Sequence, residues 1–160
     1  MFWGCISGKY GKGSSLFWEK AWKTITKESY CEHTFPVVGN YIYNSIDPHP
    51  GLSFQQDGGP GHTAAWSLDY IRQRGVIPIF WLPFSPDLSP IESIWNRMKD
   101  ISQALDPEVH RNSKRLRAAT LEAWESITDA EIRDIIYNSE SGMRARCAAV
   151  IAAHGMYTKF

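Results

Sequence analysis

The sequence has no excess of charge of either sign. It holds 17 Lys and Arg residues against 17 Asp and Glu residues, so its formal net charge at pH 7 is zero. A free-standing nucleic-acid-binding domain usually shows a basic excess, so this balance argues weakly against that class. It does not exclude DNA chemistry, because the carboxylates of a metal site offset the charge of basic contact residues.

Paired cysteines and long hydrophobic runs are also missing. Cys5, Cys31 and Cys147 are odd in number and have no paired spacing, which speaks against a disulfide framework. We therefore expect free thiols in a reducing compartment. No apolar run approaches the roughly 18 residues of a membrane span. No basic segment precedes an apolar stretch at the N-terminus, so we expect neither a membrane span nor a signal peptide.

What the sequence does contain is typical of a globular domain. Of its 160 residues, 43% are hydrophobic, and seven Trp, seven Tyr and seven Phe supply large side chains for packing. A chain of this length can bury a substantial core. We therefore predict one domain, in which residues 1–106 form the main body and residues 107–160 a helical extension of it.

Local patterns predict strands first and helices last. Apolar and β-forming residues predict a hairpin from residues 1–7 and 15–19, and the prolines and glycine of residues 47–51 predict a loop. The remaining predicted elements are a helix within 27–44, a strand over 52–56, a helix over 63–74, a strand over 76–82, a helix from Pro90, and helices over 113–127, 129–137 and 140–153. This order indicates an α/β fold with a helical C-terminal flank.

Two motifs carry most of the functional information. Residues 54–63 read Phe-Gln-Gln-Asp-Gly-Gly-Pro-Gly-His-Thr and end a predicted strand at Asp57. Residues 82–95 read Leu-Pro-Phe-Ser-Pro-Asp-Leu-Ser-Pro-Ile-Glu-Ser-Ile-Trp and place Glu92 at the third position of a predicted helix. The intervening chain has room for a loop, a helix, a strand and a loop. The two carboxylates could therefore meet at one edge of a sheet and hold divalent metal ions.

Each of these acidic residues also has a purely structural interpretation. Asp57 precedes glycine, and Asp-Gly is most often a turn. Glu92 could instead complete a capping box with Ser89. Asp87 could brace the proline-rich loop or contact metal, and His62 could position the site, contact a DNA backbone or serve local structure.

Basic residues supply candidate DNA contacts. Lys9 and Lys12 lie in the predicted hairpin turn, and Arg144 and Arg146 lie near the C-terminus. A denser cluster consists of Arg111, Lys114, Arg115 and Arg117. Such a cluster is usually a solvated helix face, but it can also follow a DNA backbone.

The two motifs resemble the catalytic domain of Tc/mariner-type DDE transposases, because both stand in the right order and at the right separation. Residues 2–7 look like the strand that follows the family's first catalytic aspartate, and residues 143–160 look like the family's C-terminus. The resemblance implies an RNase H-like fold, a mixed sheet flanked by helices. It also implies that the first strand with its Asp, and the N-terminal DNA-binding modules, lie outside this chain.

The resemblance further implies cut-and-paste DNA transposition, by phosphodiester hydrolysis followed by strand transfer. It makes Asp57 and Glu92 ligands of two Mg²⁺ or Mn²⁺ ions, and double-stranded DNA, as transposon terminal repeats and target, the partner. With one acid fewer, we expect the chain alone to be inactive. Homodimerisation and a nuclear location in a eukaryote are further expectations. Two alternatives stay open: a non-enzymatic, transposon-derived DNA-binding or interaction remnant, and an RNase H-like nuclease that cleaves without joining strands.

Overall fold

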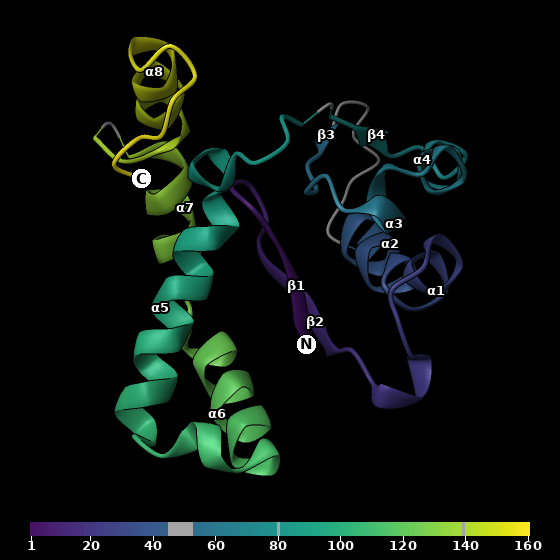
Figure 1. The fold of residues 1–160 in the computed structure, drawn as a ribbon, viewed down its shortest axis with the longest axis vertical. Coiled ribbons are helices and arrows are strands. Elements are labelled where there is room, and N and C mark those ends of the chain that lie inside the picture. The colour runs from purple at the N-terminus through teal and green to yellow at the C-terminus, as the bar shows by residue number, and fades with distance from the viewer. Residues whose placement is uncertain (45–52, 80, 139) are drawn as a thin grey trace. The chain divides into compact units, whose positions relative to one another are not determined.

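The computed structural model describes residues 1–44, 53–79, 81–138 and 140–160. It has a mixed α/β architecture with small sheets, as the order of predicted elements indicates (Figure 1). The chain divides into two compact units. Unit 1 comprises Met1–Cys5 and Gly13–Phe84, and unit 2 comprises Ile6–Lys12 and Ser85–Phe160.

The first half of the chain contains all the strands of the described residues. Its elements are β1 (Phe2–Ser7), β2 (Gly11–Phe17), the short 3₁₀-helix η1 (Lys20–Trp22), α1 (Lys27–His33), α2 (Phe35–Asn44), β3 (Ser53–Phe54), α3 (Pro60–Thr63), α4 (Ala65–Arg72) and β4 (Ile77–Pro78). From Ser85 onward the described elements are all helical. They are η2 (Pro86–Leu88), α5 (Pro90–Leu105), η3 (Val109–Arg111), α6 (Ser113–Ser126), α7 (Asp129–Tyr137) and α8 (Met143–Ala152).

The predicted N-terminal hairpin is confirmed, with a second strand that begins earlier than expected. β1 pairs with β2, which starts at Gly11 rather than at residue 15. Gly11 has φ 77°, and a Cβ at this position would overlap the carboxylate of Asp129. The same carboxylate accepts a hydrogen bond from the backbone N–H of Lys12 at 3.0 Å. Only glycine combines this backbone conformation with this close contact.

The helix predicted within residues 27–44 is two helices. Thr26 begins α1 with a capping box to Ser29, and α2 begins at Phe35. Pro36 is the second residue of α2, where its missing N–H removes no helical hydrogen bond. The predicted loop at 47–51 lies outside the described residues.

Among the described residues, the two predicted strands around the first motif are shorter than expected, while residues 52 and 80 of the predicted ranges lie outside the described residues. β3 covers Ser53–Phe54 within the predicted 52–56, and β4 covers Ile77–Pro78 within the predicted 76–82. They pair in parallel, with Ser53 opposite Ile77 and Phe54 opposite Pro78. Pro78 has no N–H to donate, which limits the ladder, although the N–H of Ile79 still donates to the Phe54 carbonyl at 2.9 Å.

The helix predicted over residues 63–74 is found as α4, but it does not include Thr63, which ends the separate short helix α3. The chain forms α3 and α4, separated at Ala64, whose backbone is extended (φ −56°, ψ 133°). The hydroxyl of Ser67 donates to the Gly61 carbonyl at 2.6 Å. This bond satisfies a carbonyl that a continuous helix would have paired with a backbone N–H.

The helices predicted after residue 88 follow the sequence closely. α5 begins at Pro90 and buries Ile94 and Met98, one turn apart on the same face. Trp124 of α6 is 1% exposed and stacks on Trp95 of α5, with ring centroids 5.8 Å apart. The helix predicted over residues 129–137 is α7, which Thr128 starts with a capping box in which Glu131 takes part.

Unit 1 has its own hydrophobic core. The core comprises the buried residues Tyr30, Cys31, Phe35, Ile71 and Val76, which come from α1, α2, α4 and the start of the β4 segment. β3 contributes Phe54 at the edge of this core. The core therefore fixes the end of β3, from which the first motif continues.

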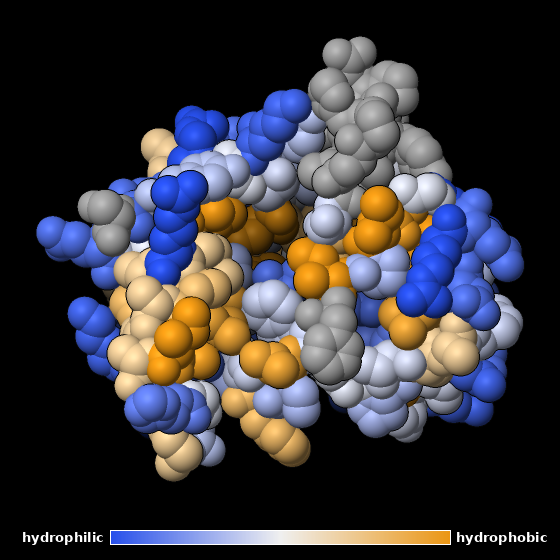
Figure 2. Space-filling view, turned by 90° about the horizontal axis from the view of Figure 1, so that it is seen from above, coloured by the Kyte–Doolittle hydropathy of each residue, from blue (hydrophilic) through white to orange (hydrophobic). Residues whose placement is uncertain are grey.

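Some large hydrophobic side chains remain at the surface. Phe84 is 95% exposed and Leu82 is 50% exposed, both within the second motif. The face drawn in Figure 2 shows hydrophobic residues in orange among hydrophilic ones in blue. In the part of the chain that the structure describes, every helix is too short or too polar to cross a membrane.

Candidate functional site

Asp57 follows β3 and is held by two neighbours in the first motif. Its Oδ1 is hydrogen-bonded to Nδ1 of His62 and accepts the backbone N–H of Gly59 at 3.1 Å. The hydrogen bond from His62, and then the bond from Gly59, hold the pKa of Asp57 below its ordinary value. The Asp57 side chain is 77% exposed. Asp57 therefore makes the contact expected of a turn residue and still presents an accessible, anionic carboxylate.

His62 is in turn held by two residues of unit 1. The Tyr30 hydroxyl donates to Oε1 of Gln56 at 2.9 Å, and Nε2 of Gln56 donates to the His62 carbonyl at 3.0 Å. The rings of Tyr30 and His62 lie 4.1 Å apart between centroids. Burial, and then the charge of Asp57, raise the pKa of Tyr30. Tyr30, Gln56, His62 and Asp57 thus form one connected chain, which we call the Asp57 network.

Only part of the Asp57 network was predictable from the sequence. Gln56 belongs to the first motif, and its amide can both donate and accept, which is a usable signal. Tyr30 lies in α1, in a stretch without a recognisable motif. No local pattern connects it to Gln56, so sequence reasoning missed it.

Glu92 occupies the third position of α5, as predicted. The capping-box interpretation is wrong, because Ser89 makes no side-chain capping bond at this helix. Within the described residues, nothing donates a hydrogen bond to the Glu92 carboxylate, and the residue is exposed. The N-terminus of a 16-residue helix favours a negative charge in its first turn. Glu92 is therefore a carboxylate that makes no local side-chain contact among the described residues.

Asp87 lies in η2 and has a structural partner. Its Oδ2 accepts the hydroxyl of Thr158 at 3.1 Å, and its backbone carbonyl accepts a guanidinium N–H of Arg146 at 3.1 Å. These contacts agree with the structural interpretation of Asp87, in which it braces the proline-rich loop.

The two hairpin lysines differ in their surroundings. Nζ of Lys12 donates to the carbonyls of Trp124 and Glu125 at 2.7 and 2.8 Å, where it caps the C-terminus of α6. Lys9 is exposed, with its Nζ 4.9 Å from the centroid of the Tyr10 ring. Of the two, Lys9 has the ammonium that can reach a phosphate without losing such bonds.

The basic cluster around the start of α6 is exposed. Arg111 pairs with Glu108 at 2.9 Å, and Arg115 pairs with Asp106 at 2.6 Å. Lys114 is exposed and forms no ion pair with the described residues. Arg117 is exposed and makes interactions of its own. Lys114 is therefore the residue of this cluster whose charged group is most available to bind a phosphate.

The donor chemistry of the two acids suits hard cations, since Mg²⁺ and Mn²⁺ prefer carboxylate oxygens. Among the described residues, no three His, Cys, Asp or Glu side chains are grouped so that they could hold a metal ion. Asp57 belongs to unit 1 and Glu92 to unit 2. Each is described within its own unit, and the meeting of the two carboxylates stays a prediction.

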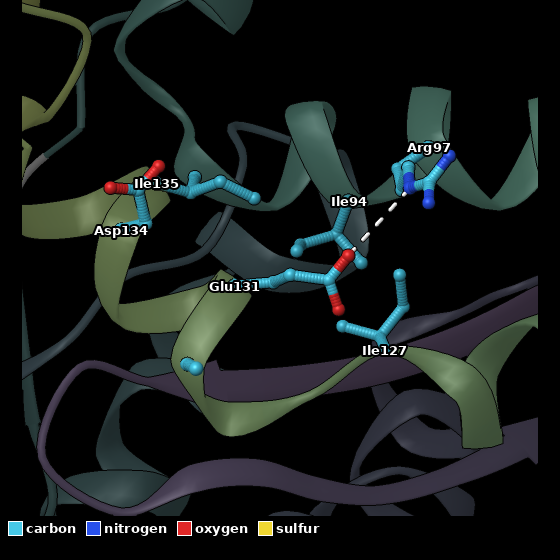
Figure 3. A pocket seen from close by; sticks show the side chains of 7 residues that line it. Ile94, Arg97, Ile127, Glu131, Asp134 and Ile135 are labelled. Atoms are coloured by element: carbon cyan, nitrogen blue, oxygen red, sulfur yellow. Dashed lines mark ion pairs between the residues drawn. The ribbon is translucent and has the colours of Figure 1, made fainter.

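Unit 2 also carries an open groove of about 400 Å³. It is lined by Ile94, Arg97, Ile127, Ala130, Glu131, Asp134 and Ile135. Figure 3 shows Glu131 reaching toward Arg97, with which it forms an ion pair at 3.7 Å. None of the residues predicted for the functional site lines this groove.

Comparison with known proteins identifies relatives over nearly the whole chain. No family model matches. The chain is 29% identical to the transposable element Tcb1 transposase of Caenorhabditis briggsae, and the match covers 98% of this chain and 58% of the relative. It is 27% identical to the Tc1 transposase of Caenorhabditis elegans, with the same two coverages, and 27% identical to the Tcb2 transposase of Caenorhabditis briggsae, covering 100% and 54%.

The chain thus spans little more than half the length of these curated relatives. Both motifs lie within the matched regions, since the matches leave at most a few residues of this chain uncovered. The chain is therefore a sequence relative of the Tc-element transposases, which confirms the resemblance to the Tc/mariner family that its motifs predict.

Proposed function

We propose that this chain is part of the catalytic domain of a Tc/mariner-type DDE transposase, with an RNase H-like fold, and that Asp57 and Glu92 are ligands of Mg²⁺ or Mn²⁺. The observation that carries the proposal is the state of Glu92. It is exposed at the first turn of α5, inside the second motif, and its carboxylate serves no cap and no ion pair among the described residues.

The Asp57 network supports the proposal from the other motif. A carboxylate with a depressed pKa stays anionic at neutral pH, which is the state that binds metal. The hydrogen bond from His62 fixes the direction of the carboxylate, and Tyr30 with Gln56 fixes His62. Such outer contacts orient a ligand and reduce the cost of ordering it on binding.

When bound, two divalent ions would supply Lewis acidity and align the attacking and leaving oxygens of a phosphodiester. The residues of this chain would contribute the remaining functions. Asp57 and Glu92 would hold oxygen ligands in place. Exposed basic residues, Lys114 first among them, would bind the DNA backbone.

Metal binding to the full chain tests the proposal directly. Titration with Mn²⁺, followed by electron paramagnetic resonance, should show binding, and Asp57→Asn or Glu92→Gln should each weaken it by about tenfold or more. Matched controls are Asp69→Asn and Glu122→Gln, which change exposed acids outside both motifs. If the two acids share ions, the double variant should bind little less than either single variant.

Binding that is equal in the wild-type chain and in both single variants would refute the assignment. Two alternatives need a different assay. A strand-transfer reaction on DNA carrying terminal repeats, with Mg²⁺, separates a transposase from a nuclease that cleaves without joining. DNA binding that is independent of both acids, without any Mn²⁺ site, would favour a non-enzymatic remnant.

A further inference from the structure

Arg146 is the only charged side chain that is buried in the described part of the chain. It is 6% exposed, although it lies on the short helix α8 near the surface. Arg144, two residues earlier on the same helix, is exposed and forms no bond with the described residues. Burying a guanidinium is costly unless its N–H groups are paired, so its contacts need an explanation.

The guanidinium of Arg146 donates in three directions. Nε donates to the Ser141 carbonyl at 3.0 Å, one terminal nitrogen donates to the Asp87 carbonyl at 3.1 Å, and the other donates to Oγ of Ser93 at 2.6 Å. Ser141 precedes α8, whereas Asp87 and Ser93 belong to η2 and α5. Arg146 therefore ties the start of α8 to a segment more than fifty residues away in sequence.

The two distant acceptors lie on either side of Glu92. Asp87 is in the η2 turn that leads into α5, and Ser93 is the residue directly after Glu92. Since η2 and the first turn of α5 are held by one rigid fork, the backbone between them has little freedom. Arg146, which lies outside the second motif, thus restrains the chain on both sides of Glu92.

A second contact strengthens the same attachment. The Thr158 hydroxyl donates to the Asp87 carboxylate at 3.1 Å, and the ring of Phe160 lies 5.1 Å from Cζ of Arg146. Both come from the C-terminal segment that follows α8. The C-terminal part of unit 2 thus packs against the segment that carries Glu92.

We propose that Arg146 is a positioning residue for Glu92, which it holds in place through Asp87 and Ser93. This inference rests on the proposed function of Glu92 as a metal ligand. It assigns to α8 a role in the metal site, although α8 contributes no acid to it.

The test compares Arg146→Lys with Arg144→Lys in the full chain. Lysine keeps the positive charge but cannot span three separate acceptors. Arg146→Lys should lower Mn²⁺ affinity about tenfold while far-UV circular dichroism shows a folded chain. Arg144→Lys should bind as the wild type does. Ser93→Ala should act in the same direction, and the double variant of Arg146 and Ser93 should lose less than the sum of the two.

A purely structural role for Arg146 would change thermal stability but not the Mn²⁺ affinity of the folded chain. Wild-type affinity in both folded variants, Arg146→Lys and Ser93→Ala, would therefore overturn the positioning role, even where Glu92→Gln still abolishes binding. If Arg146→Lys does not fold, Ser93→Ala decides the question by the same affinity measurement. Failure of the wild-type chain to bind Mn²⁺, or binding that ignores Glu92→Gln, would instead refute the proposed function, and this inference with it.

Discussion

Removing one hydroxyl from the Asp57 network should destabilise the protein measurably. Tyr30 is 2% exposed, and its hydroxyl donates to Oε1 of Gln56 at 2.9 Å. Tyr30→Phe keeps the ring that packs against His62 but leaves this half-buried amide oxygen without its donor. Loss of a hydrogen bond that leaves an acceptor unpaired costs about 1–2 kcal/mol in free energy of unfolding. For a chain of this size, each kcal/mol lowers Tm by roughly 2–4 °C.

Urea unfolding followed by tryptophan fluorescence measures this loss. The matched control is Tyr157→Phe, since Tyr157 is 88% exposed and its hydroxyl forms no bond with the described residues. The control should change the free energy of unfolding by less than about 0.5 kcal/mol. A double-mutant cycle of Tyr30→Phe with Gln56→Ala should give a coupling energy of about 0.5 kcal/mol or more. If Tyr30→Phe matches the control and the coupling is zero, the network does not hold His62.

Three further outcomes are expected. Gly75→Ala should lower the free energy of unfolding by about 1–2 kcal/mol, because Gly75 has φ 75° in open space. Gly11→Ala should lower it further, because the added Cβ would also overlap Asp129. Equal losses in urea unfolding would contradict the contact between Gly11 and Asp129. The Thr128 N–H holds the pKa of Glu131 below its ordinary value. The ionised Glu131 side chain therefore stabilises the fold at pH values above its ordinary pKa, and this stabilisation is lost as the pH falls through the lower pKa of the folded state. The difference in Tm between wild type and Glu131→Ala should therefore shrink below pH ~4. Lys114→Ala should reduce the salt dependence of DNA affinity by about one unit of slope, measured by fluorescence anisotropy, and an unchanged slope would remove Lys114 from the DNA contacts.

Elements with strong local signals were predictable. Thr128 followed by an acidic first turn is typical of a helix start, and the structure begins α7 there with a capping box. Ser89-Pro90 predicts the start of α5 equally well, because Pro at the first position favours a helix start. Yet the capping bond of Ser89 itself is absent, since a Pro at the first position fixes only the backbone and does not orient the cap side chain.

Elements whose limits depend on a neighbour were predicted less well. Of the residues that the structure describes in the apolar run at 76–82, only the two of β4 form a strand, because strand length is set by the partner strand and by Pro78. The break at Ala64 depends on the side chain of Ser67, which a helical periodicity does not reveal.

Residue type alone likewise did not predict which of two similar basic side chains is buried or already bonded. Arg144 and Arg146 look equivalent as candidate phosphate contacts in the sequence. The structure exposes one and buries the other against η2 and α5. Lys12 and Lys9 differ in the same way, because the end of α6 engages only Lys12.

The sequence by itself determined the two motifs, the family relationship and the placement of Asp57 after a strand and Glu92 in the first turn of a helix. These features depend on residues close together along the chain, so local patterns contain them. Only the tertiary structure decided what holds each acid in place. Tyr30 reaches Gln56 and Arg146 reaches Ser93 across long sequence separations. Such contacts form only when cores bring distant helices together, and no spacing within one segment encodes them.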